Sequence, residues 1–407
     1  MVQHILLAYS GGLDTSVAIH WLKQHHHAKV TCALIDVGQP LPGIEDAKER
    51  ARQNGAEAIH IVDAKQAFVE DYLAPAIQAN ALYEGAYPLA TALARPLIAK
   101  ELVHLAAQVG ADAIAHGCTG KGNDQVRIEC GIHALAPNLT VLAPQRSHPM
   151  TRDEVLRYAD QHNLALPPAK NSPYSIDENL WGRSAEGHDI EDPASIVPEA
   201  AYAWTQAPQA APETPGTVAI QFQGGIPVAL DGVALPLEAL IAKLNEFAGH
   251  HGVGRIDHVE NRLVGIKTRE AYEAPAATAI LVAKAALENL TLTRDEAHLK
   301  PQLEQTFANL VYDGKWFHPV MQPVQAFISA VQQHVTGIVT LQLYKGQAMA
   351  IRSTSKQALF DEALATYKDG DAFHHQAAEG FIELWGLPQV VANKTRAKAQ
   401  LDLEASW

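Results

Sequence analysis

Short apolar runs alternate with helical patterns along the first 142 residues, and this alternation restricts the fold more than any other feature. The strand-like runs are rich in apolar and β-branched residues and cover 4–8, 29–37, 58–62, 112–116 and 140–142. The helical patterns between them cover 17–22, 44–54, 64–79 and 91–109. Strands that alternate with helices of this length form βαβ units. The sequence therefore predicts an α/β domain whose parallel sheet is covered by helices on both faces.

Beyond this region the composition changes, and the pattern becomes that of an α+β domain. Prolines interrupt the chain at Pro167, Pro168, Pro173, Pro208, Pro212 and Pro215. Two hairpins are predicted where short β-patterned runs flank Gly224-Gly225 and Lys345-Gly346, and a helical stripe runs from Leu237 to Phe247. The end of the chain is helical but has little core of its own, which indicates docking onto another surface. We expect three parts, at 1–166, 167–365 and 366–407.

The charge balance and the apolar runs exclude several classes of protein. The 45 acidic residues against 31 Lys and Arg give a net charge of −14, whereas binding to nucleic-acid backbone needs clustered basic residues. The apolar run at 276–283 ends at Lys284, too short for a membrane span, and no signal-peptide pattern precedes the first strand. Cys32, Cys118 and Cys130 form no CxxC pair, which suits a reducing compartment. We expect a cytoplasmic enzyme with no nucleic-acid or membrane partner.

A glycine loop between the first strand and the first helix is the most informative segment for function. It has the sequence Ala8-Tyr9-Ser10-Gly11-Gly12-Leu13-Asp14-Thr15-Ser16. Backbone N–H groups at a helix N-terminus attract anions, and two glycines let a phosphate approach the backbone. Asp14 could cap the helix or hold a metal ion carried by the phosphates. The spacing fits neither a Walker loop nor GxGxxG, and the alternative is a turn and helix cap without a ligand.

A second polar loop, from His116 to Arg127, follows the strand predicted at 112–116. It combines three glycines with hydroxyl, amide and charged side chains. Loops that follow strands of a parallel sheet open at the edge where ligands bind, so we expect both loops there. Taken alone, this segment could also be a solvated glycine-rich turn. Within it, His116 could carry a proton or make structural hydrogen bonds, and Cys118 is expected to be a small packing residue.

The nine-residue loop resembles the pyrophosphate-binding loop (PP-loop), SGGxD[ST]S, of the ATP-pyrophosphatase superfamily. Together with the second loop it resembles the argininosuccinate synthase family, and the resemblance extends over essentially the whole chain. Further matching blocks are Ala81-Leu82-Tyr83-Glu84, Leu93-Ala94-Arg95-Pro96, Asp177-Glu178-Asn179-Leu180, Gly252-Val253-Gly254-Arg255-Ile256-Asp257, Val259-Glu260-Asn261-Arg262, Tyr272-Glu273 and Leu310-Val311-Tyr312. The resemblance implies an adenine nucleotide α-hydrolase-like domain with a parallel sheet, an α+β synthetase domain and a C-terminal helical tail.

The resemblance also implies an activity. Such enzymes are ligases that join L-citrulline and L-aspartate with ATP, giving argininosuccinate, AMP and diphosphate in arginine biosynthesis. Mg²⁺ would be bound to the phosphates, and no metal site built from protein side chains is expected. The family is typically a homotetramer in which a C-terminal helix embraces other subunits. Two alternatives stay open: another adenylating PP-loop ligase, and an adenine-nucleotide-binding regulatory protein without catalysis.

Position by position, the resemblance assigns roles to individual residues. ATP would be held by Ala8, Tyr9, Ser10, Gly11, Gly12, Leu13, Asp14, Thr15, Ser16, Ile35 and Gly117. L-Citrulline would be bound by Tyr87, Thr91, Asn123, Arg127, Ser175, Ser184, Glu260 and Tyr272. L-Aspartate would be bound by Thr119, Asn123 and Asp124, and the candidate catalytic residues are Asp14, Arg95, Lys121 and Asp124. Ala92 stands where some members carry a serine.

The implied chemistry needs no protein nucleophile. Transfer of AMP to the ureido oxygen of citrulline makes the ureido carbon reactive and the oxygen a good leaving group. Catalysis would then rest on holding three substrates in place. Arg127 suits a substrate carboxylate, Glu260 an α-ammonium group and Asp124 the attacking amine of aspartate. Lys121 would neutralise a phosphate or a substrate carboxylate.

Overall fold

The computed structural model describes residues 2–40, 43–168, 172–368 and 370–404. The chain divides into two units, residues 1–357 and 358–407, and each is described by itself. Residues 169–171, in the expected second part, and 369 and 405–407, in the expected tail, lie outside the described residues. The expected boundary after residue 166 stays a prediction.

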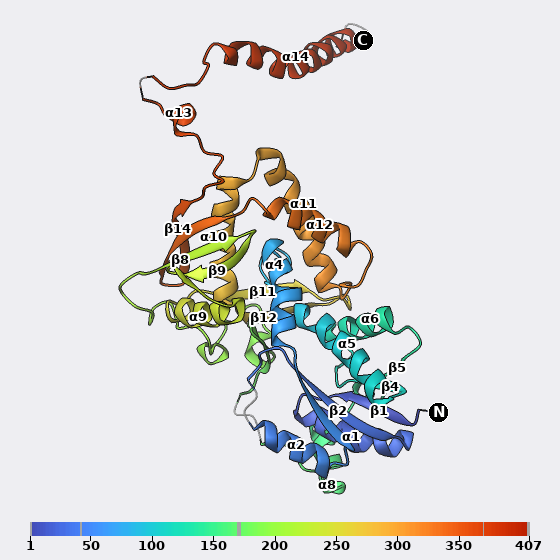
Figure 1. The fold of residues 1–407 in the computed structure, drawn as a ribbon. Coiled ribbons are helices and arrows are strands. Elements are labelled where there is room, and N and C mark those ends of the chain that lie inside the picture. The colour runs from blue at the N-terminus through green and yellow to red at the C-terminus, as the bar shows by residue number, and fades with distance from the viewer. Residues whose placement is uncertain (1, 41–42, 169–171, 369, 405–407) are drawn as a thin grey trace. The chain divides into compact units, whose positions relative to one another are not determined.

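The described residues form the predicted parallel sheet, and its five strands have the order β3-β2-β1-β4-β5 (Figure 1). Its strands are β1 (His4–Ala8), β2 (Lys29–Asp36), β3 (Ala58–Asp63), β4 (Ala113–Ala115) and β5 (Thr140–Leu142). β1 lies between β2 and β4, so the strand order changes direction there. The loops that follow β1 and β4 consequently open at the same edge, where α/β proteins bind their ligands.

Helices cover both faces of this sheet, because alternate side chains of each strand point to opposite faces. On one face, Leu6 packs in a core that includes α5 (Ala90–Val109). On the other, Ile5 and Leu7 pack with α1 (Leu13–His26) and α2 (Ile44–Gln53). The remaining helices of this half are α6 (Asn123–Leu135), which packs on α5, α7 (Pro144–Ser147) and α8 (Arg152–Gln161), which packs on α1.

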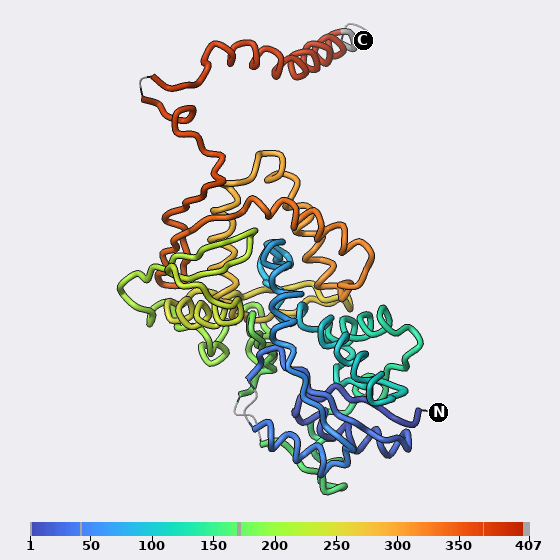
Figure 2. The backbone as a smooth tube through the Cα atoms, in the orientation of Figure 1, coloured from blue at the N-terminus to red at the C-terminus, as the bar shows by residue number. Residues whose placement is uncertain are grey.

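The segment predicted as a helix at 64–79 is helical but interrupted. It consists of α3 (Lys65–Ala67), a π-helical stretch at Phe68–Leu73 and α4 (Ala74–Gln78). A π-helical turn widens the hydrogen-bond spacing by one residue and rotates the side chains that follow it. α4 packs against α10, α12 and β9 of the second half, as the blue tube among green and orange segments shows (Figure 2).

The second half contains two antiparallel sheets, neither of which continues the first. Both predicted hairpins are confirmed, and β8 pairs with β13 to join them into one sheet. In the described residues its strands are β10 (Val233–Ala234), β9 (Ile226–Leu230), β8 (Gly216–Gln223), β13 (Gly337–Tyr344) and β14 (Gln347–Thr354). The accompanying helices are α9 (Leu237–His250), α10 (Pro275–Thr291), α11 (Arg294–Tyr312) and α12 (Met321–Gln332).

The other sheet, which the sequence did not predict, lies beside the candidate site. The described residues give it the order β11-β12-β7-β6. These strands are β11 (Arg255–Asn261), β12 (Lys267–Glu273), β7 (Arg183–Glu186) and β6 (Ser175–Glu178). In register, Tyr272 lies opposite Ser184, and Ser184 lies opposite Asp177. Polar side chains from three strands are therefore neighbours across the sheet.

A buried polar cluster ties Asn80, two residues beyond α4, to helices α10 and α11. The Asn80 side-chain amide donates to Glu288 at 2.8 Å and to Glu304 at 2.7 Å, and its oxygen accepts from Lys284 at 2.8 Å. Lys300 pairs with both carboxylates. Buried charges are tolerated only when they are paired and hydrogen-bonded. The cluster therefore favours the observed packing of the two halves, in which every one of these pairs is formed.

The second unit contains α13 (Glu362–Ala365) and α14 (Ala377–Glu404), which confirms the helical tail. Exposed apolar side chains on α14 include Phe381, Ile382, Leu384, Trp385 and Leu387. None of the helices in the described part of the chain combines the length and the apolar character that crossing a membrane requires.

Candidate active site

The glycine loop connects β1 to α1 in a conformation that depends on glycine. Gly11 has φ +73°, a region that residues with a side chain rarely adopt. A Cβ there would also lie 3.3 Å from the Ala47 Cβ. Gly12, not Asp14, is the N-cap of α1, so the capping interpretation of Asp14 is wrong. The first-turn N–H groups of α1 thus begin directly after a glycine pair at the ligand edge of the sheet.

Residues of β2 and α2 hold this loop in place through hydrogen bonds. The Tyr9 hydroxyl donates to the Ala47 carbonyl at 3.1 Å, and the Tyr9 N–H donates to Ala33. Arg50 donates to the Gly11 carbonyl at 3.2 Å, while the Ser10 hydroxyl accepts from the Gly12 N–H at 3.3 Å. The loop is therefore held by contacts to Ala33, Ala47 and Arg50 and by one internal hydrogen bond.

The second loop reaches the first at Gly117. A Cβ on Gly117 would lie 2.9 Å from the Thr15 Cγ2, so only glycine lets the two loops approach this closely. Ile35, expected near the adenine, lies within β2 and its side chain is buried in the core. A nucleotide could contact only the backbone at that position.

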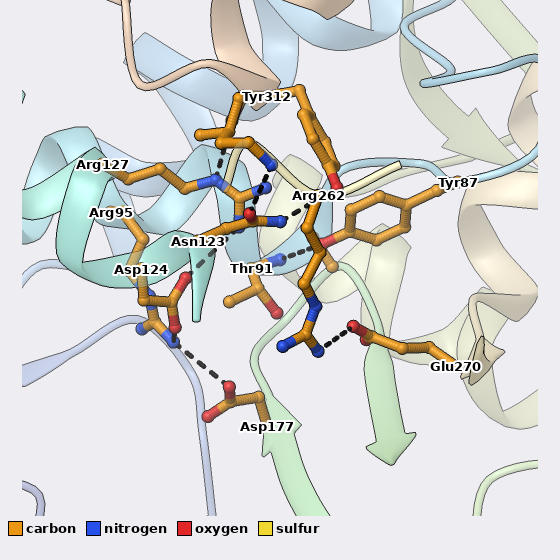
Figure 3. A network of polar contacts seen from close by, with 12 residues as sticks. Tyr87, Thr91, Arg95, Asn123, Asp124, Arg127, Asp177, Arg262, Glu270 and Tyr312 are labelled. Carbon is orange, nitrogen blue, oxygen red and sulfur yellow. Dashed lines mark hydrogen bonds and ion pairs between the residues drawn. The ribbon is translucent and has the colours of Figure 1, made fainter. Parts of the chain in front are cut away.

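The second loop leads into a polar pocket between α5, α6 and the sheet containing β12. Its lining residues are Tyr87, Thr91, Gly122, Asn123, Asp124, Arg127, Asp177, Ser184, Glu186, Glu260, Arg262, Glu270 and Tyr272. Figure 3 shows many of these side chains converging from different elements. Residues two apart in a strand point to the same face, which explains how Ser184 and Glu186 reach the pocket together. The same holds for Glu270 and Tyr272.

A charged network occupies the end of the pocket at α6. Asp124 accepts from Arg95 at 2.6 Å and from Arg127 at 3.2 Å, and Arg95 also contacts Asp177 at 3.3 Å (Figure 3). Burial alone would raise the pKa of Asp124, but the two guanidinium groups outweigh it and hold that pKa below its ordinary value. Asp124 is thus an anion beside the N-terminus of α6.

Arg127 keeps one donor available. Its Nε donates to the Tyr312 carbonyl at 2.9 Å, and its Nη1 contacts Asp124. Its buried Nη2 has no hydrogen-bond partner among the described residues. A buried guanidinium nitrogen without an acceptor is costly, so a substrate carboxylate would complete this group.

The opposite wall is built from tyrosines around Glu260. Glu260 accepts from the hydroxyls of Tyr272 at 2.6 Å and Tyr312 at 2.7 Å. The Tyr87 ring stacks on Tyr272 with centroids 4.2 Å apart, and the Tyr87 hydroxyl accepts the Thr91 N–H at 3.0 Å. The carboxylate of Glu260 is therefore held in one orientation at the pocket wall.

Three functional candidates here, Glu186, Glu270 and Arg262, were missed by the sequence analysis. Arg262 pairs with Glu186 and, at 3.0 Å, with Glu270, and donates to the Lys121 carbonyl at 3.3 Å. Burial, together with the nearby carboxylates of Glu260 and Glu186, raises the pKa of Glu270 to about 8 despite the ion pair with Arg262. The sequence held two signals, the position of Arg262 in a block that matches the family and the two-residue spacing of Glu270 and Tyr272.

Other predicted residues lie at the margin. Ser175 is exposed on β6, Thr119 and Lys121 are exposed on the second loop, and none of them lines the pocket. Arg95 does not line the pocket. It forms an ion pair with Asp124, which does, and this pair lowers the pKa of Asp124. The structure brings the other predicted citrulline-binding residues together, and the individual roles of all these residues stay predictions.

His116 has a structural environment. It is buried, its Nε2 lies 3.0 Å from Glu129, and its Nδ1 lies 3.3 Å from the Cys118 N–H. Burial and the Asp124 carboxylate raise the pKa of the Cys118 thiol to about 12, so the reactive thiolate is scarce at neutral pH. These contacts favour the hydrogen-bonding interpretation of His116 and the packing interpretation of Cys118.

The described residues offer few protein ligands for a Mg²⁺ ion at the glycine loop. No group of three or more His, Cys, Asp or Glu in the described residues is arranged to hold a metal ion. Asp14, however, is exposed in the first turn of α1, and a single carboxylate suits a cation that is carried mainly by phosphate oxygens. Asp14 is therefore the candidate protein ligand.

Replacement of Glu270 by glutamine tests the charge of the pocket. Because the folded-state pKa of about 8 lies above the ordinary 4.5, the folded chain keeps a proton that the unfolded chain releases. The wild-type free energy of unfolding should then fall between pH 4.5 and 8. Glu270→Gln mimics the protonated form. Its free energy of unfolding should therefore rise, relative to that of the wild type, by at least about 1 kcal/mol across this window.

Thermal unfolding of both proteins between pH 5 and pH 9 measures this difference. The exposed Glu246 on α9 provides the control, since Glu246→Gln removes a carboxylate that lies outside the pocket. A constant difference for Glu270→Gln would contradict the assignment of a bound proton.

The fold and the site define a class of protein. A glycine loop at the switch point of a parallel sheet, in contact with a loop that enters a polar pocket, describes a nucleotide-binding domain joined to a small-molecule site. Comparison with known families gives the same division. Residues 4–165 match the "Arginosuccinate synthase N-terminal HUP domain", and residues 174–392 match the "Arginosuccinate synthase C-terminal domain".

Individual relatives are similar along nearly the whole chain. Argininosuccinate synthase of Lactiplantibacillus plantarum is 53% identical over 398 residues, covering 98% of this chain and 96% of the relative. Those of Symbiobacterium thermophilum and Bacillus subtilis are 51% and 50% identical, covering 97% and 98% of this chain and 98% of each relative. The chain belongs to the argininosuccinate synthase family, as the loop sequences predicted.

Proposed function

We propose that this protein is a C–N-bond-forming ligase that converts L-citrulline, L-aspartate and ATP into argininosuccinate, AMP and diphosphate, a reaction of arginine biosynthesis. One observation carries the proposal: the loop after β4 touches the glycine loop at Gly117 and enters the charged pocket at Asn123. A nucleotide on one loop and amino acids in the pocket would therefore be adjacent. Family membership supports the same activity.

Citrulline is proposed to lie along the wall that carries Arg127 and Glu260. The unpaired Nη2 of Arg127 would take its α-carboxylate, because guanidinium and carboxylate form charge-assisted hydrogen bonds. Its α-ammonium group would lie by Glu260, with Glu186 also lining the pocket. Tyr87, Thr91, Ser184 and Tyr272 would complete this subsite and direct the ureido group toward the nucleotide.

Aspartate is proposed to bind at the N-terminus of α6. The helix dipole and the Thr119 hydroxyl suit its carboxylates, and Asn123 would contact both amino acids. Asp124, kept ionised by Arg95 and Arg127, would orient the amine. Lys121, exposed on the same loop, would offset phosphate or carboxylate charge.

The reaction then has two steps. The ureido oxygen of citrulline attacks the α-phosphorus of ATP, and diphosphate leaves from the glycine loop. The amine of aspartate next attacks the ureido carbon, and AMP leaves with its oxygen. The chain's contribution is to hold the reacting atoms together and to offset phosphate charge with the first-turn N–H groups of α1. Mg²⁺ bound beside Asp14 would supply further charge neutralisation when present.

We further propose that the protein works in the cytoplasm as a homotetramer. The exposed apolar side chains of α14 support an association through the tail, since isolated helices seldom leave so many apolar groups in water. Light scattering of the full chain and of a chain ending before residue 370 would measure this. Equal masses per particle would reject a role for the tail in assembly.

Diphosphate and AMP release from ATP tests the proposed activity. Citrulline and aspartate are added singly, together and as unrelated amino-acid pairs. We expect sustained release only with citrulline and aspartate together, and one AMP for each argininosuccinate formed. Release with a carboxylate or RNA substrate would indicate another adenylating ligase, and nucleotide binding without release would indicate a regulatory protein.

A further inference from the structure

Tyr312 does not line the pocket, yet it contacts three residues that do. It ends α11 and is fully buried. Its neighbours include Asn123 and Arg127 from α6 and Glu260 from β11. These elements are far apart in the sequence, and Tyr312 bridges them (Figure 3).

The Tyr312 hydroxyl makes two directed hydrogen bonds. It donates to Glu260 at 2.7 Å and accepts from the Asn123 side-chain amide at 2.9 Å. A phenol has a single proton, so the donation to Glu260 leaves its lone pairs for Asn123. The Asn123 oxygen accepts the Leu263 N–H at 2.9 Å, which fixes the other end of the amide.

The remainder of Tyr312 orients Arg127. The Arg127 guanidinium carbon lies 4.6 Å from the centre of the Tyr312 ring, and the Arg127 Nε donates to the Tyr312 carbonyl at 2.9 Å. Tyr83 stacks on the other side of the ring, with centroids 3.4 Å apart and planes tilted by 4°. The buried ring thus contacts both the Arg127 guanidinium and the Tyr83 ring.

We propose that Tyr312 is a positioning residue that keeps the two amino-acid subsites in register. Through its hydroxyl, the orientation of Glu260 in the citrulline subsite depends on that of Asn123, which faces both subsites. This inference rests on the proposed function, because it takes citrulline and aspartate as the two occupants. Tyr312 itself touches neither substrate.

The variant Tyr312→Phe removes the hydroxyl alone and keeps the ring, the carbonyl and the stack. Glu260 then loses one of its two phenol donors, and the Asn123 amide loses its acceptor. A lost hydrogen bond to a buried carboxylate predicts a rise in the KM for citrulline of about 10-fold or more. The KM for aspartate should rise about threefold, and the KM for ATP should change by less than about twofold.

Tyr83→Phe is the matched control. Tyr83 belongs to the same stack, but its hydroxyl donates to the Asn261 carbonyl at 2.9 Å, outside the Glu260–Asn123 chain. The KM values of the Tyr83→Phe variant for the three substrates should stay near those of the wild type. Thermal unfolding of both variants reports any loss of stability separately.

A purely structural role for Tyr312 would lower the active fraction, and with it kcat, while leaving every KM unchanged. That outcome, or an equal rise in all three KM values, would overturn the proposal. Wild-type protein that releases no AMP with citrulline and aspartate would instead refute the proposed function. The two failures are therefore distinguishable in one set of assays.

Discussion

Arg127→Ala is expected to raise the KM for citrulline by at least about 100-fold, with a much smaller change in the KM for ATP. Arg127 is buried, and its unpaired Nη2 is the donor available for the substrate carboxylate. Hydrogen bonds to a charged group contribute about 1.5–3 kcal/mol each, and the two N–H groups on Nη2 can make two. Two lost bonds correspond to about two or more powers of ten in affinity.

Arg269→Ala separates this effect from the general cost of losing a buried arginine. Arg269 lies on β12, is similarly buried and pairs with Asp257, but does not line the pocket. Its replacement should lower the Tm and leave the KM for citrulline unchanged. An unchanged citrulline KM in Arg127→Ala would remove Arg127 from the substrate site.

Gly11→Val is expected to lower kcat/KM for ATP by at least about 100-fold. A left-handed conformation costs a residue with a side chain roughly 1–2 kcal/mol, and a β-branched residue more. The added carbon atoms would also press on Ala47, 3.3 Å from a Cβ at this position. The loop must shift, and shifts of about 1 Å at a reacting centre can reduce the rate by about 100-fold.

Gly110→Val measures the cost of a positive φ at a position where the new side chain meets no other atom. Gly110 ends α5 with φ +68° and has no atom within 4 Å of a Cβ built there. This variant should lose stability and keep the wild-type KM for ATP. If both glycine variants lowered kcat/KM for ATP equally, the glycine loop would have no special role in nucleotide binding. Diphosphate release and thermal unfolding measure the two effects.

Local patterns were sufficient to predict the parallel sheet, the helices up to residue 109 and both hairpins. The strand-like runs at β1 and β2 are almost entirely apolar because both of their faces are buried. The glycine loop was recognisable because a tight turn, a helix start and several hydroxyls lie within nine residues. Features of this kind depend on residues that are close in the sequence.

The sheet that builds the pocket could not be predicted in the same way. β6 and β7 have the sequences SIDE and RSAE, which lack the usual apolar alternation because one face carries the polar pocket. Their pairing with β12 is long-range and sets which polar residues meet. Glu270 and Tyr312 enter the site only through this pairing and through the packing of α11.

The placement of α4 determines when the protein can finish folding. Asn80 leaves the ribosome 204 residues before its partner Lys284, an interval of about 10–40 s at ordinary rates of translation. Throughout this time α4, which carries the buried Ile77, lacks helices α10 and α12, which pack on it in the finished chain. We therefore expect the amino-terminal half, made on its own, to leave apolar side chains of α4 exposed and to aggregate.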